Sequence, residues 1–196
     1  MIIPLEELSA PILMFVPEAP DVQPPFRKNA DDSGYDVHVY KFVKMMVSSM
    51  GVGEFEEVPD PDTGVIPGAG ISADEIILNP GERVLISAGY SATVRIPSGF
   101  PSWLGFDISI CSRSGTPYKE GLVVANQPGT VDVSYRGSIL VAIANIGKMA
   151  RRIKKGDRIA QLVVRPVLLV DILKTDVLPA PGSDRGDKGF GSSGKR

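Results

Sequence analysis

Cysteine and histidine are scarce in this chain of 196 residues, which has one of each. A single cysteine, Cys111, cannot form an intrachain disulfide and is typical of a reducing compartment. One cysteine and one histidine also cannot supply the nitrogen and sulfur ligands of a zinc site within one chain. Any catalytic metal is therefore expected to be a hard ion held by oxygen atoms.

The chain also lacks a long apolar run, a basic cluster near its start and a strong net charge. Its longest apolar run is far shorter than the ~18 residues of a membrane span. The segment 1–20 contains three glutamates and no secretory signal pattern. The net charge is −2, so the global basic footprint of a nucleic-acid binder is missing. We expect a cytoplasmic protein that binds neither membrane nor nucleic acid.

Glycine and proline, by contrast, are abundant, with 21 and 17 residues. Such a chain turns often, so we expect many short strands. The candidate strands are mostly β-branched, bounded by turn-forming residues, and lie at 35–40, 75–78, 83–87, 91–96, 103–110, 122–124, 138–144 and 158–164. Phe42, Met46 and Met50 recur at helical spacing, which predicts one short helix at 41–50. The whole pattern favours an all-β barrel or jelly roll.

Two segments do not fit this pattern of strands. Residues 41–73 are predicted to be an insertion, because 51–70 is rich in Gly, Pro and acidic residues and is longer than ordinary connections. The insertion is either a solvated surface loop or an arm that grips a neighbouring subunit. Residues 183–196, SDRGDKGFGSSGKR, cannot bury enough apolar surface to become ordered alone.

This terminal segment is either a frayed end or a phosphate clamp. As a clamp, its glycine N–H groups, its serine hydroxyls and Arg185 would bind phosphate oxygens. Phe190 is the one large apolar group there and is free to stack on a flat base. We therefore divide the chain into a β-barrel domain at 1–182, including the insertion, and a mobile C-terminal lid at 183–196.

Five short motifs occur in order along the chain: SGYDV at 33–37, RSG at 113–115, the segment 126–137 with GTVDVSYRG, GDRIAQLV at 156–163, and RGDKGFGSSG at 185–194. Their order, and the spacing between Ser114, Asn126 and Asp132, resemble the trimeric dUTPase family. One departure is Ser112, which stands where that family usually has proline. The resemblance implies a distorted jelly-roll β-barrel that forms a homotrimer with a C-terminal arm. It also implies hydrolysis of dUTP to dUMP and pyrophosphate, which limits uracil in DNA and supplies dUMP for dTMP synthesis.

The resemblance further implies roles for residues of the third motif. Asp132 would orient and deprotonate the water that attacks the α-phosphorus, although a turn-forming aspartate is the alternative. Tyr135 would pack under the deoxyribose and exclude a 2′-hydroxyl, or else be a half-buried strand tyrosine. The uracil edge would be bound by Asn126 and the neighbouring backbone, with Leu140 in the same pocket; the backbone positions are Gly129, Thr130 and Val131. Such fixed donors and acceptors reject cytosine, because mismatched buried polar groups stay unpaired.

The phosphate ligands implied by the resemblance come from the other motifs. They are Arg113, Ser114 and Gly115 from a neighbouring subunit, Gln161, and the tail residues Arg185, Gly191, Ser192 and Ser193. The tail residue Phe190 would stack on the uracil. Mg²⁺ would be held chiefly by the triphosphate, as suits an ion that prefers phosphate oxygens and keeps waters. Asp36 would bond a water of the magnesium shell or brace the site.

Two other functions compete with this interpretation. A dCTP deaminase, which shares the trimeric fold, needs a glutamate ten residues beyond the aspartate, and Ala142 stands at that position. A non-catalytic trimer that binds nucleotide as a scaffold or regulator is the second alternative, and regulation in addition to catalysis stays open. A mere binder, however, has no use for a carboxylate that activates water.

Overall fold

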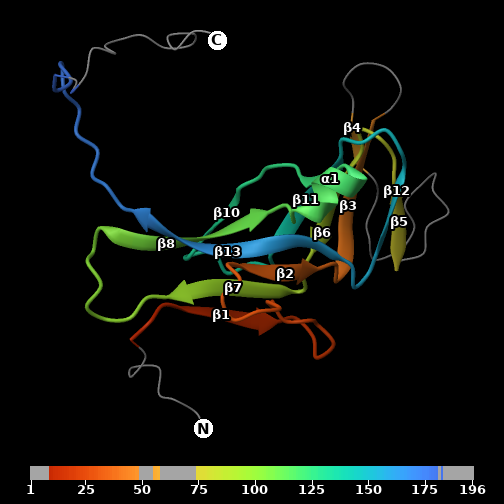
Figure 1. Cartoon of the computed structure of the whole chain (residues 1–196), viewed down its shortest axis with the longest axis horizontal. Helices are drawn as coiled ribbons and strands as arrows, with labels where there is room; N and C mark the ends of the chain where they lie inside the picture. Colours follow the sequence, from red (N-terminus) through yellow and green to blue (C-terminus); the bar gives the residue numbers. More distant parts are fainter. Residues whose placement is uncertain (1–8, 49–54, 58–73, 181, 183–196) are drawn as a thin grey trace.

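Nearly all regular elements of the computed structural model, which describes residues 9–48, 55–57, 74–180 and 182, are strands (Figure 1). In chain order they are β1 (Ile12–Pro17), β2 (Gly34–His38), β3 (Lys41–Ser48), β4 (Phe55–Glu57), β5 (Glu75–Leu78), β6 (Arg83–Ser87), β7 (Tyr90–Arg95), β8 (Leu104–Cys111), α1 (Gly115–Glu120), β9 (Leu122–Val124), β10 (Gly129–Asp132), β11 (Leu140–Asn145), β12 (Arg151–Lys154) and β13 (Arg158–Leu168). The all-β prediction is confirmed. No helix in the described part of the chain has the length and apolarity needed to cross a membrane.

Two larger antiparallel sheets carry the fold, one with the strand order β10-β8-β13-β2 and one with the order β4-β3-β6-β11-β9. The pairs β1-β7 and β12-β5 form two smaller sheets. Strand side chains alternate between faces, and the inward set from both larger sheets joins one apolar cluster. Ile86, Ile108 and Leu162 within it are completely buried. The strand order places β8 and β13 inside the first sheet, with β10 and β2 at its edges.

The strands β5, β6 and β9 have the predicted bounds, and β2, β7, β8, β11 and β13 overlap the predicted ranges with shifted ends. The strands β1, β4, β10 and β12 are absent from the predicted set. They are short or lie beside turn-rich sequence. The strands β1 and β12 pair with partners far along the chain, whereas β4 pairs with the preceding strand β3 and β10 with β8. For such segments the local pattern is weak, because tertiary pairing decides their conformation.

The predicted helix at 41–50 is wrong, because residues 41–48 form the strand β3, which pairs with β6. The register shifts between Phe42 and Lys44, as at a β-bulge. A bulge adds one residue to a strand, so Phe42 and Met45 are both buried although their spacing of three would place them on opposite faces of a regular strand. The bulge thereby gives buried positions a spacing that resembles a helix.

The helix α1 was not predicted, and its sequence shows how so short a helix forms. Pro117 lies in the first turn, where backbone N–H groups make no hydrogen bond within the helix, so the missing N–H of proline costs no bond. The helix ends at Gly121, whose φ of 73° is left-handed and whose N–H donates to the carbonyl of Pro117. The Arg113-Ser114-Gly115 segment is therefore fixed between the end of β8 and the start of α1.

Candidate functional site

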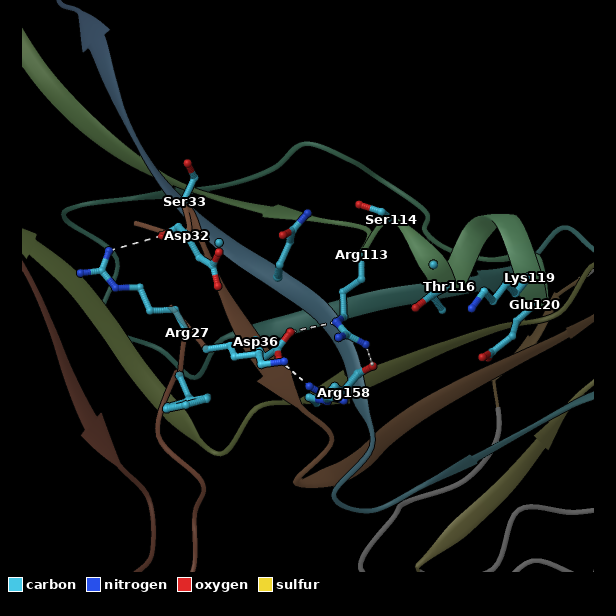
Figure 2. Close-up of a pocket in the computed structure, with 15 residues that line it drawn as sticks. Arg27, Asp32, Ser33, Asp36, Arg113, Ser114, Thr116, Lys119, Glu120 and Arg158 are labelled. Carbon is cyan, nitrogen blue, oxygen red and sulfur yellow. Dashed lines mark hydrogen bonds and ion pairs between the residues drawn. The ribbon is translucent and has the colours of Figure 1, made fainter. Parts of the chain in front are cut away.

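A cleft of about 650 Å³ opens where β2, the end of β8, α1 and the start of β13 meet (Figure 2). We call it the arginine cleft; it is lined by Phe26, Arg27, Lys28, Asp32, Ser33, Gly34, Asp36, Arg113, Ser114, Gly115, Thr116, Lys119, Glu120, Arg158 and Gln161. Five of these side chains are basic and three are acidic, so the cleft favours an anion. It brings together residues of the first, second and fourth motifs, including Asp36, Arg113 and Gln161.

Asp36 holds two arginines at the floor of the arginine cleft. Its Oδ1 accepts a hydrogen bond from Arg113 Nε at 2.8 Å, and its Oδ2 one from Arg158 NH1 at 3.2 Å. Arg113 NH1 also donates to the carbonyl of Arg158 at 3.3 Å. The carboxylate thus orients the Arg113 guanidinium from one side and leaves its remaining N–H donors for a ligand. Arg158 is a residue to which the sequence analysis gave no role.

Gln161 and Ser112 tie the second motif to the fourth. Gln161 Nε2 donates to the Ser112 carbonyl at 2.9 Å, and a Cβ on Gly34 would collide with Gln161 Oε1. The Ser112 hydroxyl accepts from the Val124 N–H at 2.8 Å, and the Ser112 N–H donates to Gln127 Oε1 at 2.9 Å. A proline has neither an N–H donor nor a hydroxyl, so it could make neither bond, and the bond from Val124 needs the serine hydroxyl itself.

One wall of the cleft is the loop before β2, which the sequence analysis did not assign. Arg27 lies 5.1 Å from the centre of the Tyr35 ring and donates to the Asp32 carbonyl at 3.4 Å. The backbone N–H and the side chain of Asn29 donate to the Asp32 carboxylate, and these bonds lower the pKa of Asp32. The loop is therefore held in shape and presents basic side chains to the cleft.

His38 lies on β2 two residues beyond Asp36. Burial lowers its pKa, Asp36 raises it, and Arg158 and Arg113 lower it further. Its Nδ1 is buried and has no hydrogen-bond partner among the described residues. The neutral imidazole is thus the favoured form beside the two arginines.

The third motif forms a second group at the opposite edge of the same sheet. Asp132 ends β10, an edge strand, and its side chain is exposed. The Tyr135 N–H donates to the Asp132 carbonyl at 2.9 Å, which closes a turn. The Tyr135 hydroxyl donates to the Ser138 carbonyl at 3.1 Å, and the tyrosine remains 43% exposed. Tyr135 is therefore fixed at its hydroxyl end while its ring stays accessible.

The predicted uracil-binding residues lie beside this turn. Asn126 and Thr130 are exposed, Gly129 is buried, and Val131 is half-buried. Leu140, at the start of β11, is 41% exposed, which is high for a large apolar side chain. The group thus offers an exposed backbone edge, an aromatic ring and an apolar side chain close together in the sequence.

The strand register separates these two groups within one chain. Asp132 pairs with Asp107 and Asp107 with Arg165, whereas Asp36 pairs with Gln161 and Gln161 with Cys111. Three steps between strands and four residues along β8 give roughly 20 Å between Asp132 and Asp36. Within the described residues, nothing from 126–140 lines the arginine cleft. One chain therefore does not place Asp132 beside Arg113.

The predicted site residues of the fifth motif, Arg185, Phe190, Gly191, Ser192 and Ser193, lie outside the described residues. Arg158, Lys119, Arg27 and Lys28 line the cleft but were missed as site residues. Arg158 lies inside the fourth motif, and this position in the sequence could have identified it as a site residue. The other three have no such signal, because basic residues on loops and short helices are common on protein surfaces.

Comparison with known proteins agrees with the family resemblance, and the second to fifth motifs lie inside the matched region. The dUTPase family model matches residues 71–194. A deoxyuridine 5′-triphosphate nucleotidohydrolase from Nautilia profundicola is 40% identical over 124 residues, which cover 63% of this chain and 80% of that protein. The protein of the same name from Wolbachia pipientis subsp. Culex pipiens is 34% identical over 158 residues, covering 78% of this chain and 97% of the relative.

A solved structure shows the same fold. A mutant of the Staphylococcus bacteriophage 80alpha dUTPase with dUpNHpp superposes with a TM-score of 0.65 at 23% sequence identity, covering 94% of this chain and 99% of that chain. The jelly-roll prediction agrees with this likeness. The family match extends over more than half of the sequence and includes the third motif, α1 and β13, whereas β2 and the loop before it lie outside the matched residues. The chain belongs to the dUTPase family of dUTP-hydrolysing enzymes.

Proposed function

We propose that this chain hydrolyses dUTP to dUMP and pyrophosphate, with Asp132 activating the attacking water. The observation that carries the proposal is an exposed carboxylate on an edge strand, next to Tyr135 and inside the segment that the family model matches. An exposed Asp132 makes no core contact that would explain it structurally. An accessible carboxylate can accept a proton from a water positioned at a phosphorus.

In the proposed reaction, water attacks the α-phosphorus and the bond to the bridging oxygen of the β-phosphate breaks. Asp132 accepts the proton of the water, and pyrophosphate leaves with the bond electrons. Asn126, Leu140 and the backbone of 129–131 hold the uracil, and Tyr135 occupies the space beneath the sugar. Arg113, Ser114, Gly115 and Gln161 bind the phosphates, with Arg113 oriented by Asp36.

The residues present fit a magnesium ion that is held by the substrate. Among the described residues, no three carboxylate, histidine or cysteine side chains cluster closely enough to hold a metal. Both oxygens of Asp36 are bound by arginines, so we assign Asp36 to bracing Arg113. Mg²⁺ on the phosphate oxygens would supply charge neutralisation of the leaving pyrophosphate.

We further propose that each active site is built from more than one subunit of a homotrimer. The roughly 20 Å between Asp132 and Asp36 in one chain is too long for one triphosphate to bridge both groups, so a second copy supplies one of them. The segment after β13 supports assembly, because it runs away from the body of the molecule (Figure 1) with exposed apolar side chains. These are Leu169, Val170, Ile172, Leu173, Val177 and Leu178. Such a surface is typical of a subunit contact.

Residues 183–196 act as the lid in this proposal, with Arg185 and the glycines and serines at 191–193 on the phosphates and Phe190 on the uracil. Deleting 183–196 should lower kcat/KM for dUTP about 100-fold, because closure positions the phosphates and excludes bulk water. The truncated protein should keep its oligomeric size in light scattering, since the truncation removes none of the described strands. An unchanged rate after truncation would remove the lid from the mechanism.

The function is tested by pyrophosphate release from dUTP, dCTP, dTTP and UTP, with and without a magnesium chelator. We expect pyrophosphate release from dUTP alone, and we expect the chelator to suppress it. A nucleotide-binding scaffold would release no pyrophosphate from any of these substrates, and a deaminase would release ammonia from dCTP.

In the same assay Tyr135→Ala should reduce the preference for dUTP over UTP about 10- to 100-fold, because the ring no longer blocks a 2′-hydroxyl. Unchanged rejection of UTP by that variant would show that sugar selection lies elsewhere.

A further inference from the structure

The basic side chains of the arginine cleft are not equivalent. Arg113 and Arg158 share the carboxylate of Asp36, which offsets part of their charge. Arg27 is occupied by a backbone carbonyl. Among the described residues, Lys28 and Lys119 have no ion pair or hydrogen bond from their ammonium groups. Hydrogen bonds from Asn29 and, to a smaller extent, the charge of Lys28 lower the pKa of the Asp32 carboxylate, so that carboxylate offsets part of the Lys28 charge. Lys119 is thus the amine of the cleft that pairs with no carboxylate among the described residues.

Lys119 differs from Lys28 in being held on a fixed backbone. It lies in the last turn of α1, whereas Lys28 lies in the loop before β2. Arg151 donates to the carbonyls of Glu120 at 2.8 Å and of Lys119 at 3.3 Å. The end of α1 is also anchored at Gly121, whose carbonyl accepts from the Ile146 N–H at 2.9 Å. The Cα of Lys119 is thus held in place before any ligand binds, which lowers the entropy lost on binding.

Lys119 lies in the same cleft as the proposed phosphate ligands, so we consider which phosphates it could bind. The proposed phosphate ligands Ser114 and Gly115 begin the helix that carries Lys119, and all of them line the arginine cleft. Figure 2 shows the Lys119 side chain on the side of α1 that faces Arg113. Asp132 of another subunit must stand at the α-phosphorus, and it lies outside this cleft. In the proposed reaction, the phosphates that would reach into this cleft along α1 are the β- and γ-phosphates.

We propose that Lys119 binds the β- and γ-phosphates of the substrate and so holds the pyrophosphate leaving group. The inference rests on the proposed function and adds a residue outside the five motifs. An ammonium group is a compact charge with three donors and suits phosphate oxygens that are partly shared with a cation. The alternative role for Lys119 is a purely structural one, in which its charge stabilises the C-terminal end of the helix dipole. Because α1 has only six residues, this stabilisation is small.

The test is a calorimetric binding series on the full-length protein. The ligands are a non-hydrolysable α,β-imido analogue of dUTP, dUDP and dUMP, and the proteins are wild type, Lys119→Gln, Lys119→Arg and Lys148→Gln. Lys148 is an exposed lysine that lines none of the described pockets and serves as the matched control. Lys119→Gln should weaken the triphosphate analogue about 10- to 100-fold, as expected for a lost charged hydrogen bond. It should weaken dUMP less than about twofold.

Lys119→Arg should recover most of the affinity, and KM for dUTP should follow the same order. Equal weakening of all three ligands by Lys119→Gln would overturn the proposal, since it would indicate a structural role. So would binding indistinguishable from that of Lys148→Gln. These outcomes are separate from the fate of the proposed function, because wild-type pyrophosphate release from dUTP tests that function without reference to Lys119.

Discussion

Asp132→Asn should lower kcat for dUTP hydrolysis about 10²- to 10⁴-fold, the range that a positioned general base contributes. The amide has nearly the same shape as the carboxylate but cannot accept the proton of the water. Asp132 is exposed at the end of an edge strand, so the substitution removes no core contact and should leave the melting temperature unchanged. The measurement is single-turnover pyrophosphate release at saturating dUTP, together with calorimetric affinity for the α,β-imido analogue.

The neighbouring strand offers a matched control for this variant. Asp107 lies directly opposite Asp132 in the β10–β8 ladder, and its Oδ2 accepts a hydrogen bond from the Ser109 hydroxyl at 3.1 Å. Side chains opposite each other lie on the same face of a sheet, so Asp107 is the nearest other carboxylate in the ladder. Asp107→Asn should change kcat by less than about tenfold. If Asp107→Asn lost the activity and Asp132→Asn kept it, the assignment of the base would be wrong.

Mixed trimers should regain activity that neither parent variant has. Asp132→Asn and Arg113→Gln each remove one half of the site, and the geometry assigns these halves to different subunits. When the two variants are co-expressed with different tags and purified by both, every trimer contains both kinds of subunit. In a cyclic trimer one of its three sites then joins an intact Asp132 to an intact Arg113, which predicts about one third of the wild-type rate.

The mixed preparation is compared with each variant alone and with equal amounts of the two homotrimers mixed after purification. The homotrimer mixture, in which every trimer carries one kind of subunit, should stay inactive when it is assayed immediately after mixing. Activity of the co-purified trimers no higher than this mixture would place both halves of the site in one subunit. Light scattering of the wild-type protein gives the oligomeric state independently.

Strands whose conformation is set by local sequence could be predicted, and strands that depend on pairing with distant segments could not. The strands β5, β6 and β9 are short, apolar and bounded by turn residues, and their predicted ends match the structure. The strand β3 was mistaken for a helix because Phe42, Met46 and Met50 recur at helical spacing, whereas pairing with β6 decides its conformation. The pairing of β1 with β7 and of β12 with β5 joins segments separated by many residues, and local sequence does not encode such pairing.

Some residues of the candidate site could be identified from the sequence motifs, and others only from the structure. The motifs identified Asp36, Arg113 and Gln161, and the structure brings these three into one cleft. They did not indicate that Asp36 clamps Arg113 and Arg158, because that arrangement depends on the register of β2, β8 and β13. They also gave no role to Lys119, whose position depends on the left-handed cap at Gly121 and the bonds from Arg151.

The sequence alone determined the all-β character of this protein and its family motifs, which include an aspartate, an arginine and a tyrosine at family spacing. These follow from residue identity and local order, which folding does not alter. The tertiary structure decided where the chemistry lies. Strand order placed Asp132 and Asp36 on opposite edges of one sheet, because register and pairing are set by the packed core and by contacts between distant segments.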